Sequence, residues 1–120
     1  MSRDKRNTWE QYVAAWKEAS AQGKAAALEQ SAATACVYQD PLTMTQGHDE
    51  LIAYMLGFHK QIPGGHFVTT DFLDHHDASI AKWNMVSGDG TVIGDGVSYG
   101  QYNEQGALIA MTGFFKVPAA

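Results

Sequence analysis

The spacing of hydrophobic residues changes once along this chain, at Pro63-Gly64-Gly65. Before this break, apolar side chains recur every three or four residues, which is typical of amphipathic helices. After it, apolar and polar side chains alternate, which is typical of strands that bury one face. Helices gathered before the break and strands gathered after it predict an α+β fold in which the two kinds of element are segregated.

Three helices are expected before the break. The first begins with Asn7 as its N-cap and Glu10 as the partner in a capping box, and it ends at Gln22-Gly23. The second is rich in alanine and covers about 24–34, and the third covers about 47–60. The buried face of the first helix carries Trp9, Tyr12, Val13 and Trp16, and that of the third carries Leu51, Tyr54, Met55 and Phe58.

Strands account for most of the remaining chain. A short strand at 36–38 is stopped by Asp40-Pro41, because the residue before a proline disfavours helical backbone, and a loop is expected at 42–46. After the break, four antiparallel strands are expected at 66–73, 78–86, 91–102 and 107–117. In the second of these, Ala81, Trp83 and Met85 share one face and Ile80, Lys82 and Asn84 share the other.

Glycines interrupt the third of these strands, at Gly94, Gly96 and Gly100. Glycines inside a strand mark bulges, bends or the close approach of another group. A long sheet bent in this way can curl around the helices and enclose a cavity with apolar walls. Such a cavity is a suitable site for a small apolar molecule.

Composition and charge exclude several classes of protein. The 120 residues fit a single domain over 1–120, with residues 1–6 expected to be extended or disordered. Eight basic and thirteen acidic residues give a net charge of −5, and no basic stripe follows residue 17, so nucleic acid is not an expected partner. A membrane is not expected either, because the longest apolar stretches are too short to cross a bilayer. A lone Cys36 and the absence of a signal-like or membrane-spanning run predict a cytoplasmic location.

An ordered set of residues spans about 9–115. It consists of Trp9-x-x-Tyr12-Val13-Ala14-Ala15-Trp16, Tyr38-x-Asp40-Pro41, Gly47, Pro63-Gly64-x-x-Phe67, Trp83, and Gly106-x-Leu108 through Gly113-Phe114. This set resembles the SnoaL-like proteins of the nuclear transport factor 2-like superfamily, which also contains ketosteroid isomerase and limonene epoxide hydrolase. The resemblance implies a cystatin-like cone, in which a curved antiparallel sheet wraps around three N-terminal helices, and a homodimer formed through the outer face of the sheet.

The chemical resemblance is closest to the ketosteroid isomerase branch. In that branch, a tyrosine in a Tyr-Val-Ala-Ala context donates a hydrogen bond to the substrate oxyanion, and an aspartate before a proline is the general base. Tyr12 and Asp40 stand in these contexts. A late acid completes the oxyanion hole in the family, but its place falls here on Ser98, which is a weaker donor than a neutral carboxylic acid.

The resemblance therefore implies an isomerase or a polyketide cyclase that abstracts a proton next to a carbonyl on a small apolar substrate. Asp40, Tyr12 and Ser98 would be the catalytic residues, and no metal or organic cofactor is expected. The expected ligand-binding walls are Trp16, Tyr54, Met55, Phe58, Phe67, Trp83, Met85, Met111 and Phe115. Tyr54 and Met111 also match pocket positions of the isomerase branch.

Several alternatives remain open at this stage. Ordinary core packing could explain each wall residue, and Asp40 could simply cap a turn. The domain could then be a non-catalytic module for ligand binding or dimerisation. The relay of the epoxide hydrolases needs an arginine in the cavity, whereas Arg3 and Arg6 precede the first helix.

Two further groups of residues invite a chemical interpretation. Asp95 is the nearest acid to the one that a cyclase would use, but its odd offset from Ser98 places it on the opposite strand face. His75 and His76, flanked by Asp74 and Asp77, could suggest a metal site. Adjacent residues on a tight turn rarely chelate one ion, so a solvated hairpin tip is expected there.

Overall fold

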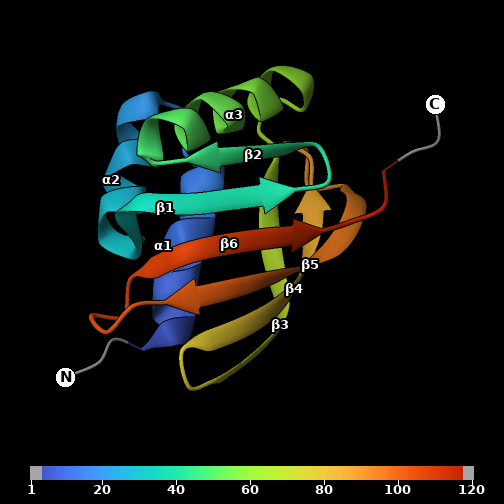
Figure 1. Ribbon diagram of the computed structural model, residues 1–120. Coiled ribbons are helices and arrows are strands. Elements are labelled where there is room, and N and C mark those ends of the chain that lie inside the picture. The colour runs from blue at the N-terminus through green and yellow to red at the C-terminus, as the bar shows by residue number, and fades with distance from the viewer. Residues whose placement is uncertain (1–3, 118–120) are drawn as a thin grey trace.

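The computed structural model describes residues 4–117, which form three helices and a single curved sheet (Figure 1). The helices are α1 (Lys5–Lys17), α2 (Ala21–Ser31) and α3 (His48–Gln61). The strands are β1 (Ala32–Asp40), β2 (Thr43–Gln46), β3 (His66–His75), β4 (Ala78–Val86), β5 (Val92–Tyr102) and β6 (Leu108–Phe114). This arrangement confirms the expected α+β fold.

The six strands follow the order β2-β1-β6-β5-β4-β3. All neighbours are antiparallel except β1 and β6, which are parallel. Strands β3 to β6 form the antiparallel meander expected after the proline-glycine break. Figure 1 shows α1 crossing behind the strands, so that the helices cover one face of the sheet and leave the other face open. No helix within residues 4–117 is long and apolar enough to cross a membrane.

The aromatic face of α1 fills the space between the helices and the sheet. Trp9, Tyr12 and Trp16 are buried, as expected from their helical spacing, and Val13 is half-buried against them. On the sheet, Ala81 is fully buried whereas its neighbour Ile80 is 48% exposed. The alternation predicted for β4 therefore assigns the inner and outer faces of the sheet correctly.

The predicted start of the first helix is wrong. Lys5 and Arg6 are already helical, and Asp4 is the N-cap, because its carboxylate accepts a hydrogen bond of 3.0 Å from the backbone amide of Arg6. Asn7 therefore lies inside α1, and no capping box forms. Residues 1–6 were expected to be extended or disordered, which is wrong for Lys5 and Arg6. Residues 1–3 lie outside the described residues.

The turn between α1 and α2 also lies elsewhere than predicted. The first helix ends at Lys17, and Ser20 caps the second by accepting a hydrogen bond of 3.0 Å from the Gly23 amide. Lys24 is fully buried, and its ammonium group donates to the carbonyl oxygens of Ala15 at 3.1 Å and Glu18 at 2.6 Å. This lysine satisfies carbonyls at the end of α1 that have no helical partner.

Residues 42–46, expected as a loop, contain the short strand β2. It pairs with β1 from Val37↔Gln46 to Asp40↔Thr43. The second helix is also shorter at its C-terminal end than predicted, because residues 32–34 belong to β1. β1 is thus a nine-residue strand that ends at Asp40, and Asp40 lies next to the reversal of the chain into β2.

The remaining strand boundaries differ by small amounts. The bounds of β4 agree with the prediction, β3 continues to His75 and β6 ends at Phe114. Gly96 allows close approach, since a Cβ atom there would lie 2.5 Å from the Trp83 ring. The register shift of the β4–β5 pair lies between Met85↔Gly94 and Val86↔Val92, so it borders Gly94.

Candidate functional site

A cavity of about 400 Å³ lies between α1, α3 and the inner face of the sheet. Its lining is mostly aromatic and aliphatic, with a few polar groups. The lining residues are Trp9, Tyr12, Val13, Trp16, Tyr38, Asp40, Leu42, Ala53, Tyr54, Gly57, Phe58, Gln61, Ile62, Phe67, Trp83, Met85, Ser98, Gly113 and Phe115. A cavity of this size and composition is typical of sites for small organic molecules.

Trp16 lies at the centre of the aromatic wall. Its ring centroid is 5.6 Å from that of Tyr38, 5.6 Å from that of Phe58 and 5.2 Å from that of Phe67. Phe67 in turn contacts Trp83 edge to face, with centroids 4.9 Å apart. These tilted and edge-on contacts are the favoured geometry for aromatic pairs, so the wall is a packed and ordered surface.

The structure brings seven of the nine expected wall residues to the cavity, but not Met55 or Met111. Both methionines are buried in the core, with exposures of 0% and 1%. Met55 and Leu51 are one turn apart on the side of α3 that faces the core, whereas Tyr54 is turned towards the cavity. Met111 pairs with Tyr38 on one side and Gly100 on the other. It lies two residues along β6 from Gly113, which lines the cavity.

The three expected catalytic residues all line the same cavity. Asp40 ends β1 and is half-buried. Its Oδ2 accepts hydrogen bonds from the hydroxyls of Tyr38 at 2.6 Å and Tyr54 at 2.9 Å. Its Oδ1 accepts backbone amides of Leu42 at 2.8 Å and Thr43 at 3.1 Å.

Asp40 therefore caps the β1–β2 turn with one oxygen and faces the cavity tyrosines with the other. A carboxylate has about four lone-pair sites, and the four bonds just described occupy all of them. The side chain is fixed in place, and a substrate proton can reach Oδ2 only after one tyrosine hydroxyl moves away.

The tyrosine hydroxyls around Asp40 keep their protons at neutral pH. Burial raises the pKa of Tyr12, Tyr38 and Tyr54 well above its usual range, and the charge of Asp40 adds to the effect. Tyr12 accepts a hydrogen bond of 3.1 Å from the indole N–H of Trp16. Among the described residues, its own hydroxyl proton has no acceptor, so it can donate to a ligand.

Ser98 lies on the inner face of β5, where it accepts a hydrogen bond of 2.9 Å from the indole N–H of Trp83. Trp83 reaches it by lying across Gly96, whose lack of a side chain makes room for the ring. Asp95 is exposed and pairs with Asn84 of the outer face, as its offset from Ser98 predicts.

Among the cavity residues to which the sequence assigned no role, Tyr38 and Gly113 lie beside Asp40. Tyr38 donates a hydrogen bond to Asp40 Oδ2, as Tyr54 does. Gly113 faces Tyr38 and Asp40 from β6. The Tyr38-x-Asp40 spacing indicates that Tyr38 lies beside Asp40, because residues two apart on a strand share a face. The position of Gly113 depends on the parallel pairing of β1 with β6, which no local pattern reveals.

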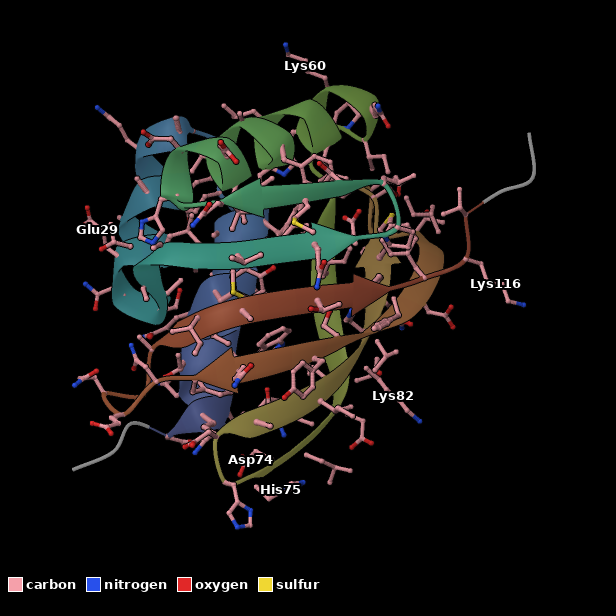
Figure 2. The ribbon with its side chains drawn as sticks, in the orientation of Figure 1. Glu29, Lys60, Asp74, His75, Lys82 and Lys116 are labelled. Carbon is pink, nitrogen blue, oxygen red and sulfur yellow. The ribbon has the colours of Figure 1, made fainter. Side chains whose placement is uncertain are left out.

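Neither His75 nor His76 lines the cavity. His75 ends β3 and His76 forms the turn, and their Nδ1 atoms are 3.1 Å apart on an exposed tip. Figure 2 shows Asp74 and His75 projecting from this hairpin, away from the helices. No group of three or more His, Cys, Asp or Glu side chains within residues 4–117 could hold a metal ion.

Several solved structures share this fold. A proposed isomerase of the SnoaL-like family from Agrobacterium tumefaciens superposes with a TM-score of 0.85 at 24% identity, covering 93% of this chain and 97% of its own. A SnoaL-like polyketide cyclase from a Jannaschia species has a TM-score of 0.71 at 13% identity, with coverages of 95% and 90%. A proposed ketosteroid isomerase from Kribbella flavida has a TM-score of 0.70 at 16% identity, with coverages of 97% and 80%.

A comparison with curated proteins found no match. The SnoaL-like domain family, in contrast, matches residues 9–115, the same stretch that carries the ordered motifs of the sequence. Because the residues that line the cavity run from Trp9 to Phe115, this match covers all of them. The chain belongs to the SnoaL-like family.

Proposed function

We propose that the cavity binds a small, mostly apolar molecule that carries a carbonyl group, and that Asp40 removes a proton from the adjacent carbon. One observation carries this proposal. Among the described lining residues, Asp40 supplies the carboxylate in a cavity whose other walls are mainly aromatic. A base in such surroundings is shielded from bulk water and can act on a carbon acid.

The geometry suggests the order of events. The substrate carbonyl accepts the hydroxyl proton of Tyr12, and Ser98 offers a second hydrogen bond from the sheet. The hydroxyl of Tyr54 leaves Asp40, because its bond of 2.9 Å is longer than the 2.6 Å bond from Tyr38 and its side chain is less buried. Oδ2 then takes the carbon-bound proton, and the enolate is stabilised by the hydroxyl donors. Return of the proton to another carbon of the same molecule completes an isomerisation.

Hydrogen exchange tests this proposal without knowledge of the natural substrate. The probe is 2-tetralone, a bicyclic ketone with acidic protons beside its carbonyl, incubated in D₂O and followed by proton NMR. Wild-type protein should speed the loss of these protons, and Asp40→Asn should abolish the gain. Asp95→Asn, which removes an exposed carboxylate on the outer face, is the matched control and should behave as wild type. Equal exchange in wild type and Asp40→Asn would contradict the proposal.

A second candidate function is a binding module without turnover. The specific observation in its favour is the full set of hydrogen bonds on Asp40, two of them from backbone amides that a ligand cannot displace. Saturation-transfer NMR with the same ketone separates the two candidates. Binding of 2-tetralone without protein-dependent exchange would favour the module over the enzyme.

We also propose that the protein is a homodimer, formed through the outer face of the sheet. Leu73, Ile80 and Tyr99 lie side by side on β3, β4 and β5, and they are 68%, 48% and 41% exposed. A contiguous row of exposed apolar side chains favours a protein interface. Light scattering should give the mass of two chains for wild type and of one chain for Ile80→Glu.

A cytoplasmic location remains a prediction of the sequence.

A further inference from the structure

The cavity contains a negative charge that no lining residue neutralises. Asp40 is the carboxylate of the lining, and no lysine, arginine or histidine is among the described residues that line the cavity. The four hydrogen bonds on Asp40 come from two tyrosine hydroxyls and two backbone amides, all of which are neutral groups. A positively charged group in the cavity is therefore attracted to Asp40. The net charge of −5 on the chain also favours the approach of a cation over that of an anion.

Three aromatic rings lie beside this charge and are here termed the aromatic cluster: Trp16, Tyr38 and Tyr54. Their ring centroids are 5.6 Å apart for Trp16 and Tyr38, 6.1 Å for Trp16 and Tyr54, and 5.9 Å for the two tyrosines. All three line the cavity, and both tyrosines bond Asp40 Oδ2 through their hydroxyls. An aromatic ring attracts a cation that lies within about 6 Å of its centroid. Because the centroids are so close together, one cation against the cluster can interact with more than one ring.

The hydrogen bonds on Asp40 determine which kind of cation suits this place. A primary ammonium group carries three N–H donors, and burying a donor without an acceptor is costly. Asp40 is the strongest acceptor in the cavity, but its lone pairs are already occupied by the four bonds. A quaternary ammonium group has no N–H donor, so it uses the charge of Asp40 and the rings without needing a free lone pair.

We infer that the cavity binds organic molecules that carry a quaternary ammonium group, held against the aromatic cluster beside Asp40. The inference rests on the proposed binding function of the cavity, and it adds a class of ligand that needs no carbonyl group.

The test compares two probes of the same shape and different charge, benzyltrimethylammonium and 2,2-dimethylpropylbenzene, in which carbon replaces the nitrogen. Both are titrated at low ionic strength and followed by tryptophan fluorescence, since Trp16 lines the cavity. The measured quantity is the affinity for the cation divided by the affinity for its neutral isostere. Asp40→Asn should lower this ratio by at least about tenfold, because only the cation loses an attraction. Asp95→Asn, which removes an exposed carboxylate from the outer face, is the matched control and should leave the ratio unchanged.

Two variants of Tyr54 test the aromatic cluster while Asp40 keeps its charge, and they keep the test decisive if Asp40→Asn does not fold. Tyr54→Leu removes one ring and should lower the ratio about threefold. Tyr54→Phe keeps the ring but withdraws a hydroxyl from Asp40 Oδ2, which frees one acceptor site. Benzylammonium, a primary ammonium probe, should bind wild type about tenfold more weakly than benzyltrimethylammonium, and Tyr54→Phe should narrow this difference.

The inference would be overturned if wild type does not bind benzyltrimethylammonium, or if Asp40→Asn lowers the ratio no more than Asp95→Asn does. A ratio unchanged by Tyr54→Leu, or tighter binding of benzylammonium than of the quaternary probe, would equally overturn it. The proton-transfer proposal fails separately, by equal ketone exchange in wild type and Asp40→Asn, and that result leaves the affinity ratio unaffected. Binding of 2-tetralone without binding of benzyltrimethylammonium would overturn the cation site alone.

Discussion

The indole ring of Trp83 lies against the backbone of Gly96 on the neighbouring strand. A Cβ atom at Gly96 would come 2.5 Å from two carbons of this ring and 2.6 Å from the Phe114 carbonyl oxygen. The same indole donates to Ser98, so one glycine determines both the shape of a cavity wall and the partner of a site hydroxyl.

Gly96→Ala should therefore move the Trp83 ring and break its bond to Ser98. Overpacking of this kind costs about 1 to 3 kcal/mol of folding free energy. Urea denaturation gives the loss, and a changed tryptophan emission maximum reports the new position of the ring. Gly90→Ala would be a poor control because Gly90 has a positive φ of 90°. Gly94→Ala is better, and a loss in Gly96→Ala no larger than in this control would show that the ring has room to spare.

The two tyrosines on Asp40 should contribute unequally to stability. Tyr38 is 7% exposed and donates at 2.6 Å, whereas Tyr54 is half-buried and donates at 2.9 Å. Hydrogen bonds to charged groups contribute about 1.5 to 3 kcal/mol, so Tyr38→Phe should lose an amount in this range and Tyr54→Phe clearly less. Chemical denaturation of the two variants measures the difference. The reverse ranking would mean that Tyr54 is the firmer partner, and the proposed release of its hydroxyl would be wrong.

Lys24 should be necessary for the junction of α1 and α2. Lys24→Met keeps much of the apolar stem but leaves the carbonyls of Ala15 and Glu18 without the ammonium group that now bonds them. Unsatisfied buried polar groups cost about 1 to 3 kcal/mol each, so the melting temperature should fall by several degrees. Lys17→Met, at an exposed position of α1, is the control and should change the melting temperature little.

Stability should decrease in alkaline solution because four tyrosines titrate abnormally. Burial raises the pKa of Tyr102 to about 12, and it also raises the pKa of Tyr12, Tyr38 and Tyr54. In the unfolded chain these phenols lose their protons near pH 10, whereas in the folded protein they retain them. The stabilising contribution of Tyr102 is thus complete below pH 10 and is lost as pH rises to about 12.

Within that window, each buried phenol should lower the free energy of unfolding by up to about 1.4 kcal/mol per pH unit. Denaturation curves at a series of pH values measure the slope, and absorbance at the wavelength of tyrosinate shows whether ionisation accompanies unfolding. Tyr102→Phe should make the slope shallower. Ionisation of all five tyrosines near pH 10 with the fold intact would contradict the burial of their hydroxyls.

Local patterns predicted the elements whose burial follows from their own spacing. The aromatic face of α1 and the two faces of β4 are such cases, because one period assigns each side chain to the core or to solvent. The start of α1 was missed because Asp4 and Asn7 are both residues that favour the N-cap position, and the structure uses Asp4. The strand β2 was missed because its four residues acquire their role only by pairing with β1.

The candidate site was predictable only in part. The positions of Tyr12 and Asp40 followed from a family resemblance, and the sequence contained the signal for Tyr38 in its spacing from Asp40. Which side of α3 faces the cavity depends on how that helix crosses the sheet, so Tyr54 and Met55 could not be distinguished by their helical period. The place of Gly113 beside Asp40 depends on strand order, which alternation along single strands does not encode.

The pairing of β1 with β6 joins parts of the chain that are distant in sequence, as the contact of Gln39 with Thr112, 73 residues away, illustrates. Asp40 ends the first of these strands and Gly113 lies near the end of the last. Closing so long a loop is entropically costly, and it slows folding in proteins built on such contacts. During synthesis on the ribosome, the helices and the first strands can form early, but recognition of a ligand must wait until the final strand has emerged and docked.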